Sequence, residues 1–256
     1  VLEIHNAAPD MELEAFVHGA MCMSYSGRCL LSTYFANRSA NRGACIQPCR
    51  WGYRITETER HASKPLDVEQ DERMTYFMNS RDLRLLRHIP EIAKSGIVSL
   101  KVEGRMKSEF YVATVANAYR KAIDEYLATG TIEHADEYDA LLETVAHRTY
   151  TDAYFEGDNL DTVCLDEGQS PEKYVFTAVV QDYKDGIATV EMRNRFRTGD
   201  TLTILSPASD TAYKTFTAGE ITDTVQNVVT DDAKYVQRIY KLACPYTLSA
   251  GDILLI

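Results

Sequence analysis

Residues 97–129 read IVSLKVEGRMKSEFYVATVANAYRKAIDEYLAT, and this stretch decides the fold. The apolar run 97–102 predicts a strand, and the charged residues 103–107 predict a loop directly after it. Ser108 can then cap a helix that ends before Gly130. Strands and helices that alternate in this order are typical of a parallel α/β arrangement.

The segments upstream and downstream agree with an α/β half. Residues 2–8 resemble the end of a helix, and residues 12–18 alternate between polar and apolar side chains as a strand does. A helix is predicted over 82–94, where Pro90 kinks or splits it, and another over 132–147. Two short strands are also predicted, at 54–56 and 74–79.

The character of the sequence changes after residue 156. A chain of 256 residues is expected to form one or two domains at about 150 residues each. Glycine, proline and acidic residues over 157–171 predict a linker. Short β-rich runs at regular spacing follow it, at 174–182, 186–193, 200–205, 216–223, 234–239 and 252–256. We therefore expect an α/β domain over 1–156 and a small all-β barrel domain over 172–256.

The composition limits the class of protein. Acidic residues outnumber basic ones by 38 to 27, and a net charge of −11 excludes a generally basic nucleic-acid-coating protein while allowing a local basic patch. No apolar run approaches the roughly 18 residues that cross a bilayer, and no secretory signal is visible, so we expect a cytoplasmic protein without a membrane partner. The chain opens on Val1 as if inside an element, so we expect a fragment or a processed chain.

Four of the six cysteines fall within 28 residues, with the spacing C-x6-C-x15-C-x3-C. They are Cys22, Cys29, Cys45 and Cys49. Without an export signal, reduced thiols are expected rather than disulfides. Clustered thiols in a reducing compartment indicate an iron–sulfur centre, a zinc site or thiols without a metal. The wide, uneven spacing favours a cluster in a loop over a zinc knuckle. Cys164 and Cys244 stand apart, as buried small side chains do.

The same window is rich in arginine and aromatic residues. Residues 22–54 contain no acidic residue and carry a charge of +5, whereas the rest of the chain sums to −16. The arginines are Arg28, Arg38, Arg42, Arg50 and Arg54, and the aromatic residues are Tyr25, Tyr34, Phe35, Trp51 and Tyr53. Arginine binds phosphate or carboxylate, and aromatic rings stack on bases. Alternatively, the arginines balance a metal cluster whose thiolates and sulfides are net negative.

Two groups of residues are candidates for chemistry in the α/β half. Glu103, Arg105 and Lys107 follow a strand and precede a helix, which suits an anionic substrate or an ordinary charged turn. Glu14 and His18 share one face of the predicted strand, where they can transfer protons or form a structural pair. The chain contains no H-E-x-x-H, G-x-S-x-G, Walker or G-x-G-x-x-G motif.

Several stretches together resemble the collagenase-like peptidase family of unassigned catalytic type. Residues 14–22, EAFVHGAMC, and 27–32, GRCLLS, are similar to the motif that defines this family. The similarity continues at 38–50, 80–83, 89–91 and 99–108, and in the C-terminal half at 193–196 and 199–200. It covers most of the chain and is closest to the tRNA hydroxylation subgroup of the family.

The resemblance implies a fold and an activity. Family members have a TIM-like barrel, so residues 1–156 are expected to be its C-terminal portion, with the N-terminal barrel segment missing. The resemblance implies prephenate-dependent hydroxylation of the wobble uridine of tRNA to 5-hydroxyuridine, with a [4Fe–4S] cluster on Cys22, Cys29, Cys45 and Cys49. The family name offers proteolysis of collagen-like substrates as the alternative, and a third possibility is a binding module stapled by the cluster.

Within this framework we assign provisional roles to individual residues. Catalytic roles are expected for Glu14, His18 and Glu103. Binding of tRNA or of the dicarboxylate prephenate is expected for Arg28, Arg42, Arg50, Arg105 and Lys107.

Overall fold

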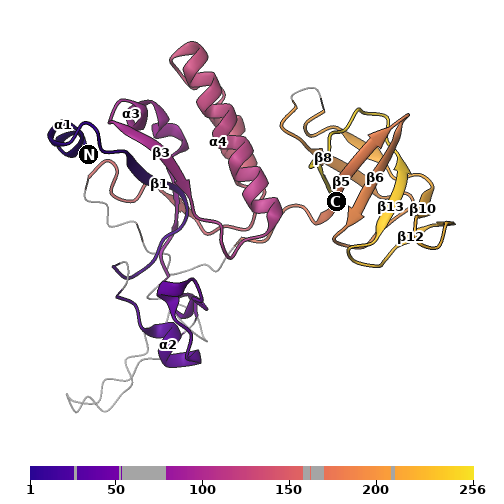
Figure 1. Ribbon diagram of the computed structural model, residues 1–256, viewed down its shortest axis with the longest axis horizontal. Coiled ribbons are helices and arrows are strands. Elements are labelled where there is room, and N and C mark those ends of the chain that lie inside the picture. The colour runs from indigo at the N-terminus through magenta and orange to yellow at the C-terminus, as the bar shows by residue number, and fades with distance from the viewer. Residues whose placement is uncertain (26–27, 52, 54–78, 158–161, 163–169, 209–210) are drawn as a thin grey trace. The chain divides into compact units, whose positions relative to one another are not determined.

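A computed structural model describes residues 1–25, 28–51, 53, 79–157, 162, 170–208 and 211–256 (Figure 1). The two short strands predicted at 54–56 and 74–79 lie outside or almost wholly outside these residues. The described chain forms two compact units, residues 1–107 with 118–171 and residues 108–117 with 172–256. Among the described helices, none combines the length and the apolar character that crossing a bilayer requires.

The first unit contains a four-stranded mixed sheet with the strand order β3-β1-β2-β4. Its strands are β1 (Leu13–Ala20), β2 (Asp82–Arg84), β3 (Ile97–Val102) and β4 (Tyr150–Thr151). Strand β1 is parallel to β3 and β2 is parallel to β4, but β1 and β2 are antiparallel. The fold is thus mixed α/β, and the predicted TIM-like barrel is not confirmed, because the described strands form an open sheet with one antiparallel pair.

The helices agree with the sequence patterns in part. They are α1 (Leu2–Ala7), α2 (Leu31–Ala36), α3 (Ile89–Ala93), α4 (Glu109–Thr129) and α5 (Ala135–Leu142), with short 3-10 turns η1 (Ala40–Arg42), η2 (Pro48–Arg50) and η3 (Leu86–His88). The predicted helix after Ser108 is confirmed as α4, and the Ser108 hydroxyl accepts a hydrogen bond from the Tyr111 amide at 3.1 Å. The helix predicted over 132–147 is shorter at both ends.

The helix predicted over 82–94 is wrong. The segment begins as strand β2, turns through η3 and becomes helical only at α3. Pro90 lies in the first turn of α3, where its missing N–H leaves no hydrogen bond unmade, so it starts a helix instead of kinking one. Leu86 and Ile89 are nevertheless buried, because the turn still directs them into the core. The apolar spacing therefore predicted correctly that these side chains are buried, but it predicted the wrong secondary structure.

Tyr119 of α4 attaches the helix to the sheet of the first unit. Its hydroxyl donates to the carbonyl of Val17 in β1 at 2.7 Å and accepts from the amide of Leu85 at 3.2 Å. Val17 and Leu85 are both buried. This one hydroxyl therefore joins β1 and the end of β2, the two strands that lead to the candidate site.

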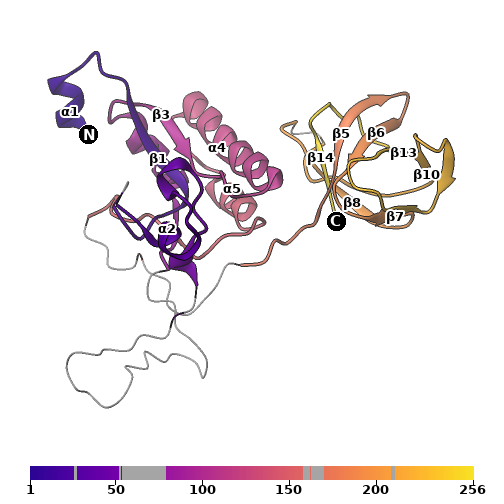
Figure 2. The same ribbon diagram turned by 60° about the horizontal axis from the view of Figure 1, so that its bottom comes forward.

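The second unit is built on an eight-stranded antiparallel sheet with the order β11-β10-β13-β6-β5-β14-β8-β9 (Figure 2). The strands are β5 (Phe176–Lys184), β6 (Ile187–Met192), β8 (Thr201–Leu205), β9 (Thr215–Thr217), β10 (Ile221–Asp223), β11 (Val228–Thr230), β13 (Ile239–Ala243) and β14 (Ile253–Leu255), and β7 (Phe196–Arg197) pairs with β12 (Asp232–Ala233). Val190, Leu202 and Leu254 belong to its fully buried core. The prediction of a β-rich domain is confirmed. The predicted closed barrel is not confirmed, because among the described residues β9 and β11 are edge strands that do not pair with each other.

Candidate functional site

The four clustered cysteines lie in the segment that follows β1. Cys22 comes two residues after the strand and is exposed, and Cys29, Cys45 and Cys49 are half-buried. The chain between them folds into α2, η1 and η2. Gln47 takes a left-handed conformation directly before the buried Pro48, which turns the chain between the last two cysteines.

Polar hydrogens point at two of the sulfur atoms. The backbone amide of Gln47 donates to Cys45 Sγ at 3.3 Å, and the hydroxyl of Ser32 donates to the same sulfur at 3.6 Å. The amide of Ser24 donates to Cys22 Sγ at 3.5 Å. Hydrogen bonds of this kind stabilise thiolates and tune the sulfur ligands of metal clusters.

Three of the thiols influence one another electrostatically. Burial raises the pKa of Cys49, Arg50 lowers it, and Cys22 and Cys45 raise it further. No three of the four clustered sulfurs, all of which are described, lie within 4.8 Å of one another. Tetrahedral zinc would hold thiolates only about 3.8 Å apart. The four sulfurs therefore do not have the close spacing of thiolates on a bound zinc ion.

A buried ion pair lies beside this loop. Asp82 and Arg148 expose 1% and 3% of their side chains. Arg148 Nε donates to Asp82 Oδ1 at 3.0 Å, its Nη2 contacts the same oxygen, and its backbone amide donates to Asp82 Oδ2 at 3.2 Å. Arg148 Nη1 also donates to Asn79 Oδ1 at 2.7 Å. The strand register places the pair, because Asp82 begins β2 opposite Ala20 of β1 and opposite Tyr150 of β4.

Two more cations approach this single carboxylate. Lys107 Nζ lies 3.9 Å from Asp82 Oδ2, and its side chain is 11% exposed. Burial lowers the pKa of Arg50, Arg148 lowers it further, and Asp82 and Cys49 raise it. Arg148 and Lys107 therefore contact Asp82 directly, and Arg50 adds positive charge to the same region beside Cys49. An anionic group bound in this region would be stabilised by these cations.

Glu14 and His18 do not share one environment. Glu14 is exposed and accepts hydrogen bonds from Lys101 Nζ and Ser99 Oγ, each at 2.8 Å. His18 is 1% exposed, and burial lowers its pKa to about 3. Regular alternation placed them on one face, but the pairing of β1 with β3 is irregular between Phe16 and His18, and this shift breaks the alternation.

The loop after β3 lies against both the end of β1 and the cysteine segment. Glu103 accepts a hydrogen bond from the amide of Arg105 at 3.0 Å. A Cβ on Gly19, at φ +118°, would lie 2.3 Å from the carbonyl oxygen of Glu103, so this contact requires glycine. A Cβ on Gly43 would similarly fall 1.8 Å from the guanidinium of Arg105. The structure thus brings the predicted anion-binding loop and the cysteine segment together.

The remaining predicted cations are distributed over the surface and interior. Arg28, Arg42 and Arg105 are exposed, and Arg50 and Lys107 are partly buried. Lys107 also donates to the carbonyl of Ala146 at 2.7 Å, so its ammonium group has partners inside the unit. Sequence reasoning did not identify Asp82 and Arg148. Asp82 begins β2 and Arg148 lies two residues before β4, so the pair is recognisable only when these strands are known to be neighbours.

Aromatic side chains form a cluster on the cysteine segment. The ring of Phe35 lies 5.2 Å from Tyr34, 5.5 Å from Trp51 and 6.1 Å from Tyr53, measured between centroids. Tyr34 is 84% exposed and Trp51 is 44% exposed. Nearby in sequence, Tyr25 is also exposed. Rings that pack on one another at their bases and remain open to solvent can accept a stacked planar group.

Fold and site together define a two-part protein, in which an α/β unit carries a cysteine-rich, cationic site and a β unit follows it. The family models match both parts, "Peptidase family U32" over residues 1–163 and "Peptidase family U32 C-terminal domain" over residues 172–254. The chain belongs to peptidase family U32, and the resemblance expected from its motifs is confirmed.

Individual relatives have two kinds of name. The chain is 35% identical to "tRNA hydroxylation protein P" of Escherichia coli over 80% of its own length and 54% of that protein. It is 39% identical to "tRNA hydroxylation protein P1" of Bacillus subtilis, over 77% of this chain and 47% of that protein. It is 35% identical to a "Collagenase" of Porphyromonas gingivalis, over 78% of this chain and 54% of that protein. The chain spans about half the length of these relatives.

Proposed function

We propose that the protein belongs to an enzyme that hydroxylates tRNA in the cytoplasm. The observation that carries this proposal is the concentration of positive charge on Arg148, Lys107 and Arg50 near Asp82, directly beside four clustered thiols. Two of the relatives described above are named as tRNA hydroxylation proteins. A cationic, cysteine-rich site is compatible with a polyanionic substrate and with redox chemistry.

The more specific reaction is the conversion of the wobble uridine to 5-hydroxyuridine with prephenate as co-substrate. A dicarboxylate needs cations at its binding site, and the Arg105 guanidinium beside Gly43 is exposed and therefore available to it. Arg50 supplies a second, partly buried guanidinium near Cys49. Lys107 contributes mainly by maintaining the positive potential, because its ammonium group bonds to a backbone carbonyl.

Cys22, Cys29, Cys45 and Cys49 are proposed to hold a [4Fe–4S] cluster. When bound, such a cluster supplies one-electron redox chemistry near the substrate. The chain's own residues support this proposal in two ways. The Gln47 amide and the Ser32 hydroxyl donate to the Cys45 sulfur, and the surrounding cations offset the negative charge that four thiolates introduce. The residues present therefore fit the group.

The exposed aromatic cluster is proposed as the surface that receives the RNA. Tyr34 and Trp51 offer faces for unstacked bases, and Arg28 and Arg42 provide exposed charge for phosphates. Single-stranded loops present bases in this way, and the wobble position lies in such a loop.

Glu14, His18 and Glu103 remain predictions as catalytic residues. With a pKa of about 3, His18 is neutral at pH 7 and can contribute a hydrogen bond but not a proton.

Proteolysis is the second candidate, because a relative with 35% identity is named a collagenase. Substitutions in the cysteine site can test directly whether peptidase activity depends on this site. Gelatin cleavage that persists in the Cys22→Ala protein and in the absence of all metal would support a peptidase and would contradict the cluster-dependent reaction.

The first test is restoration of the modification in cells. A bacterial strain without 5-hydroxyuridine in its tRNA should regain this nucleoside when the whole protein that contains this chain is expressed, as measured by mass spectrometry of tRNA digests. Blocking prephenate synthesis in that strain should abolish the gain. Unmodified tRNA in the presence of folded, abundant protein would contradict the proposal.

The second test concerns the cluster. Protein purified without oxygen should be brown and contain iron and sulfide in equal amounts, and Cys45→Ala should remove most of both. Cys244→Ala is the matched control, because Cys244 is buried in the second unit and should leave the iron content unchanged. Equal iron and sulfide in the Cys45→Ala and wild-type proteins would exclude Cys45 as a ligand.

A further inference from the structure

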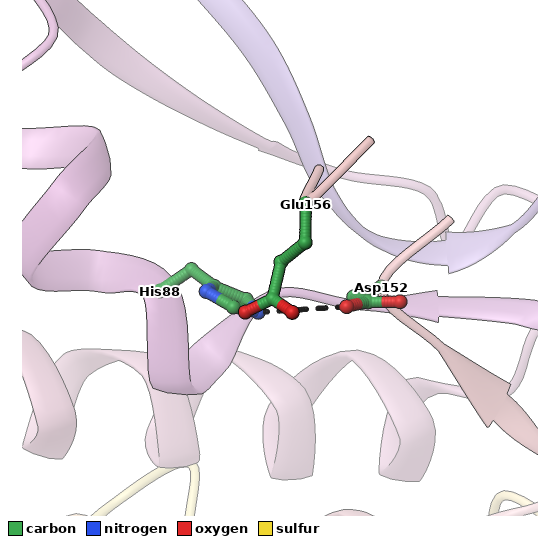
Figure 3. Close-up of side chains that lie close together, drawn as sticks. All are labelled: His88, Asp152 and Glu156. Atoms are coloured by element: carbon green, nitrogen blue, oxygen red, sulfur yellow. Dashed lines mark ion pairs between the residues drawn. The ribbon is translucent and has the colours of Figure 1, made fainter. Parts of the chain in front are cut away.

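A second group of metal-ligand side chains occurs away from the cysteines. His88, Asp152 and Glu156 each present one ligand atom, and the three atoms lie within 4.8 Å of one another (Figure 3). His88 Nε2 lies 4.0 Å from Asp152 Oδ2. His88 and Asp152 are half-buried and Glu156 is exposed, so the group is open to solvent on one side.

The topology of the sheet brings the three residues together. His88 ends η3, which follows β2, and Asp152 directly follows β4. Because β2 and β4 are neighbouring parallel strands, the segments that follow them leave the same edge of the sheet. The cysteine segment follows β1, which is antiparallel to β2, and therefore begins at the opposite edge. The group is thus distinct from the site proposed above.

Local contacts orient the ligands. The imidazole of His88 packs on the ring of Phe155, with centroids 4.3 Å apart and ring planes inclined by 35°. The amide of Phe155 donates to the carbonyl of Asp152 at 3.2 Å, and this turn directs Glu156 back toward His88. The guanidinium of Arg87, the preceding residue, contacts Asp136 and Asp139 instead of these ligands. One imidazole and two carboxylates thus supply nitrogen and oxygen donor atoms at one place.

We propose that His88, Asp152 and Glu156 bind a first-row divalent cation, of which Mn²⁺ and Zn²⁺ are representatives. Two atoms that bind one such ion at about 2.0–2.2 Å can be at most ~4.4 Å apart. The distance of 4.0 Å between His88 Nε2 and Asp152 Oδ2 is within this limit. The ligand atoms, all within 4.8 Å of one another, come closer together when the ion binds. Imidazole with carboxylates suits these metals, and three protein ligands leave positions for water or an exogenous ligand.

The experiment is a titration of the full chain with Mn²⁺, monitored by the loss of the free-ion electron paramagnetic resonance signal. Mn²⁺ is the probe because it prefers oxygen and nitrogen ligands to thiolates, so the cysteines do not compete for it. One tight site is expected, and Zn²⁺ should displace the Mn²⁺, since zinc lies above manganese in the affinity order. Asp152→Asn and His88→Gln should each weaken Mn²⁺ binding by about tenfold or more.

His134→Gln is the matched control for this titration. His134 Nδ1 lies 2.5 Å from Glu125 Oε1 on the surface, but the described residues add no third ligand to this pair. Mn²⁺ binding should be unchanged in that variant. If Asp152→Asn does not fold, the exposed Glu156→Gln provides the same test. Absence of a tight Mn²⁺ site in the wild type, or equal affinity in the His88 and Glu156 variants and the wild type, would overturn the proposal.

Discussion

Replacing Asp82 with alanine is expected to destabilise the first unit by about 3–5 kcal/mol, the range observed when one partner of a buried ion pair is removed. The change leaves Arg148, which is 3% exposed, without its carboxylate, and Lys107 and Arg50 then repel it without compensation. Unfolding in urea can be monitored through Trp51, the single tryptophan of the chain, which lies in this unit.

Two further variants make this result specific. Asp82→Asn keeps the size of the side chain and removes only its charge, so it should lose most of the same stability. Glu14→Gln removes the carboxylate of an exposed pair with Lys101 and should change the free energy of unfolding very little. Similar losses for Asp82→Ala and Glu14→Gln would contradict the assignment of the buried pair.

The Asp82 pair also has a defined pH dependence. Burial raises the pKa of Asp82, but Arg148 and Lys107 outweigh it, and the net pKa lies below the usual value. A carboxyl with a depressed pKa in the folded state contributes stability that is present above its unfolded pKa of about 3.9. This contribution should therefore disappear only as the pH falls below about 4.

The patterns that sequence reasoning identified correctly are local. The run 97–102 and the following helix need only an apolar strand and a serine cap, and both appear as β3 and α4. Residues 82–94 failed because apolar spacing does not distinguish a turn that buries Leu86 from a helix that does so. The prediction that Glu14 and His18 share one face of a strand failed for a related reason. The alternation is interrupted where β1 pairs irregularly with β3, and this irregularity depends on the partner strand.

The parts of the site that sequence could not reveal depend on strand order. The four cysteines from Cys22 to Cys49 can be recognised in the sequence because they lie close together in the chain. Asp82 and Arg148 are 66 residues apart and meet only because β2 pairs with β4. The same pairing brings His88 to Asp152. Strand partners are chosen by long-range packing, which a single sequence does not encode in any short motif.

Acidification should weaken the first unit well before Asp82 is protonated, because His18 resists protonation in the folded state. Burial lowers its pKa to about 3, with smaller contributions from the charges around it: Asp82 raises the pKa, and Arg84, His147 and Lys107 lower it. Unfolded histidine takes up its proton near pH 6.5. As the pH falls below about 6.5, the unfolded state alone binds this proton, and stability falls by up to about 1.4 kcal/mol per pH unit.

His18→Gln should flatten this decline between pH 6.5 and 4.5, since glutamine has no proton to gain, and urea unfolding monitored by Trp51 at several pH values measures it. His134→Gln provides a control of opposite sign. Its hydrogen bond to Glu125 raises the pKa of His134, so its stabilisation is present at low pH and is lost as the pH rises. In the wild-type protein, the carbon-bound imidazole protons of His18 should show no titration by nuclear magnetic resonance down to pH 4.5. A His18 midpoint near 6.5 would show that the ring is solvated and would remove the reason for the expected acid sensitivity.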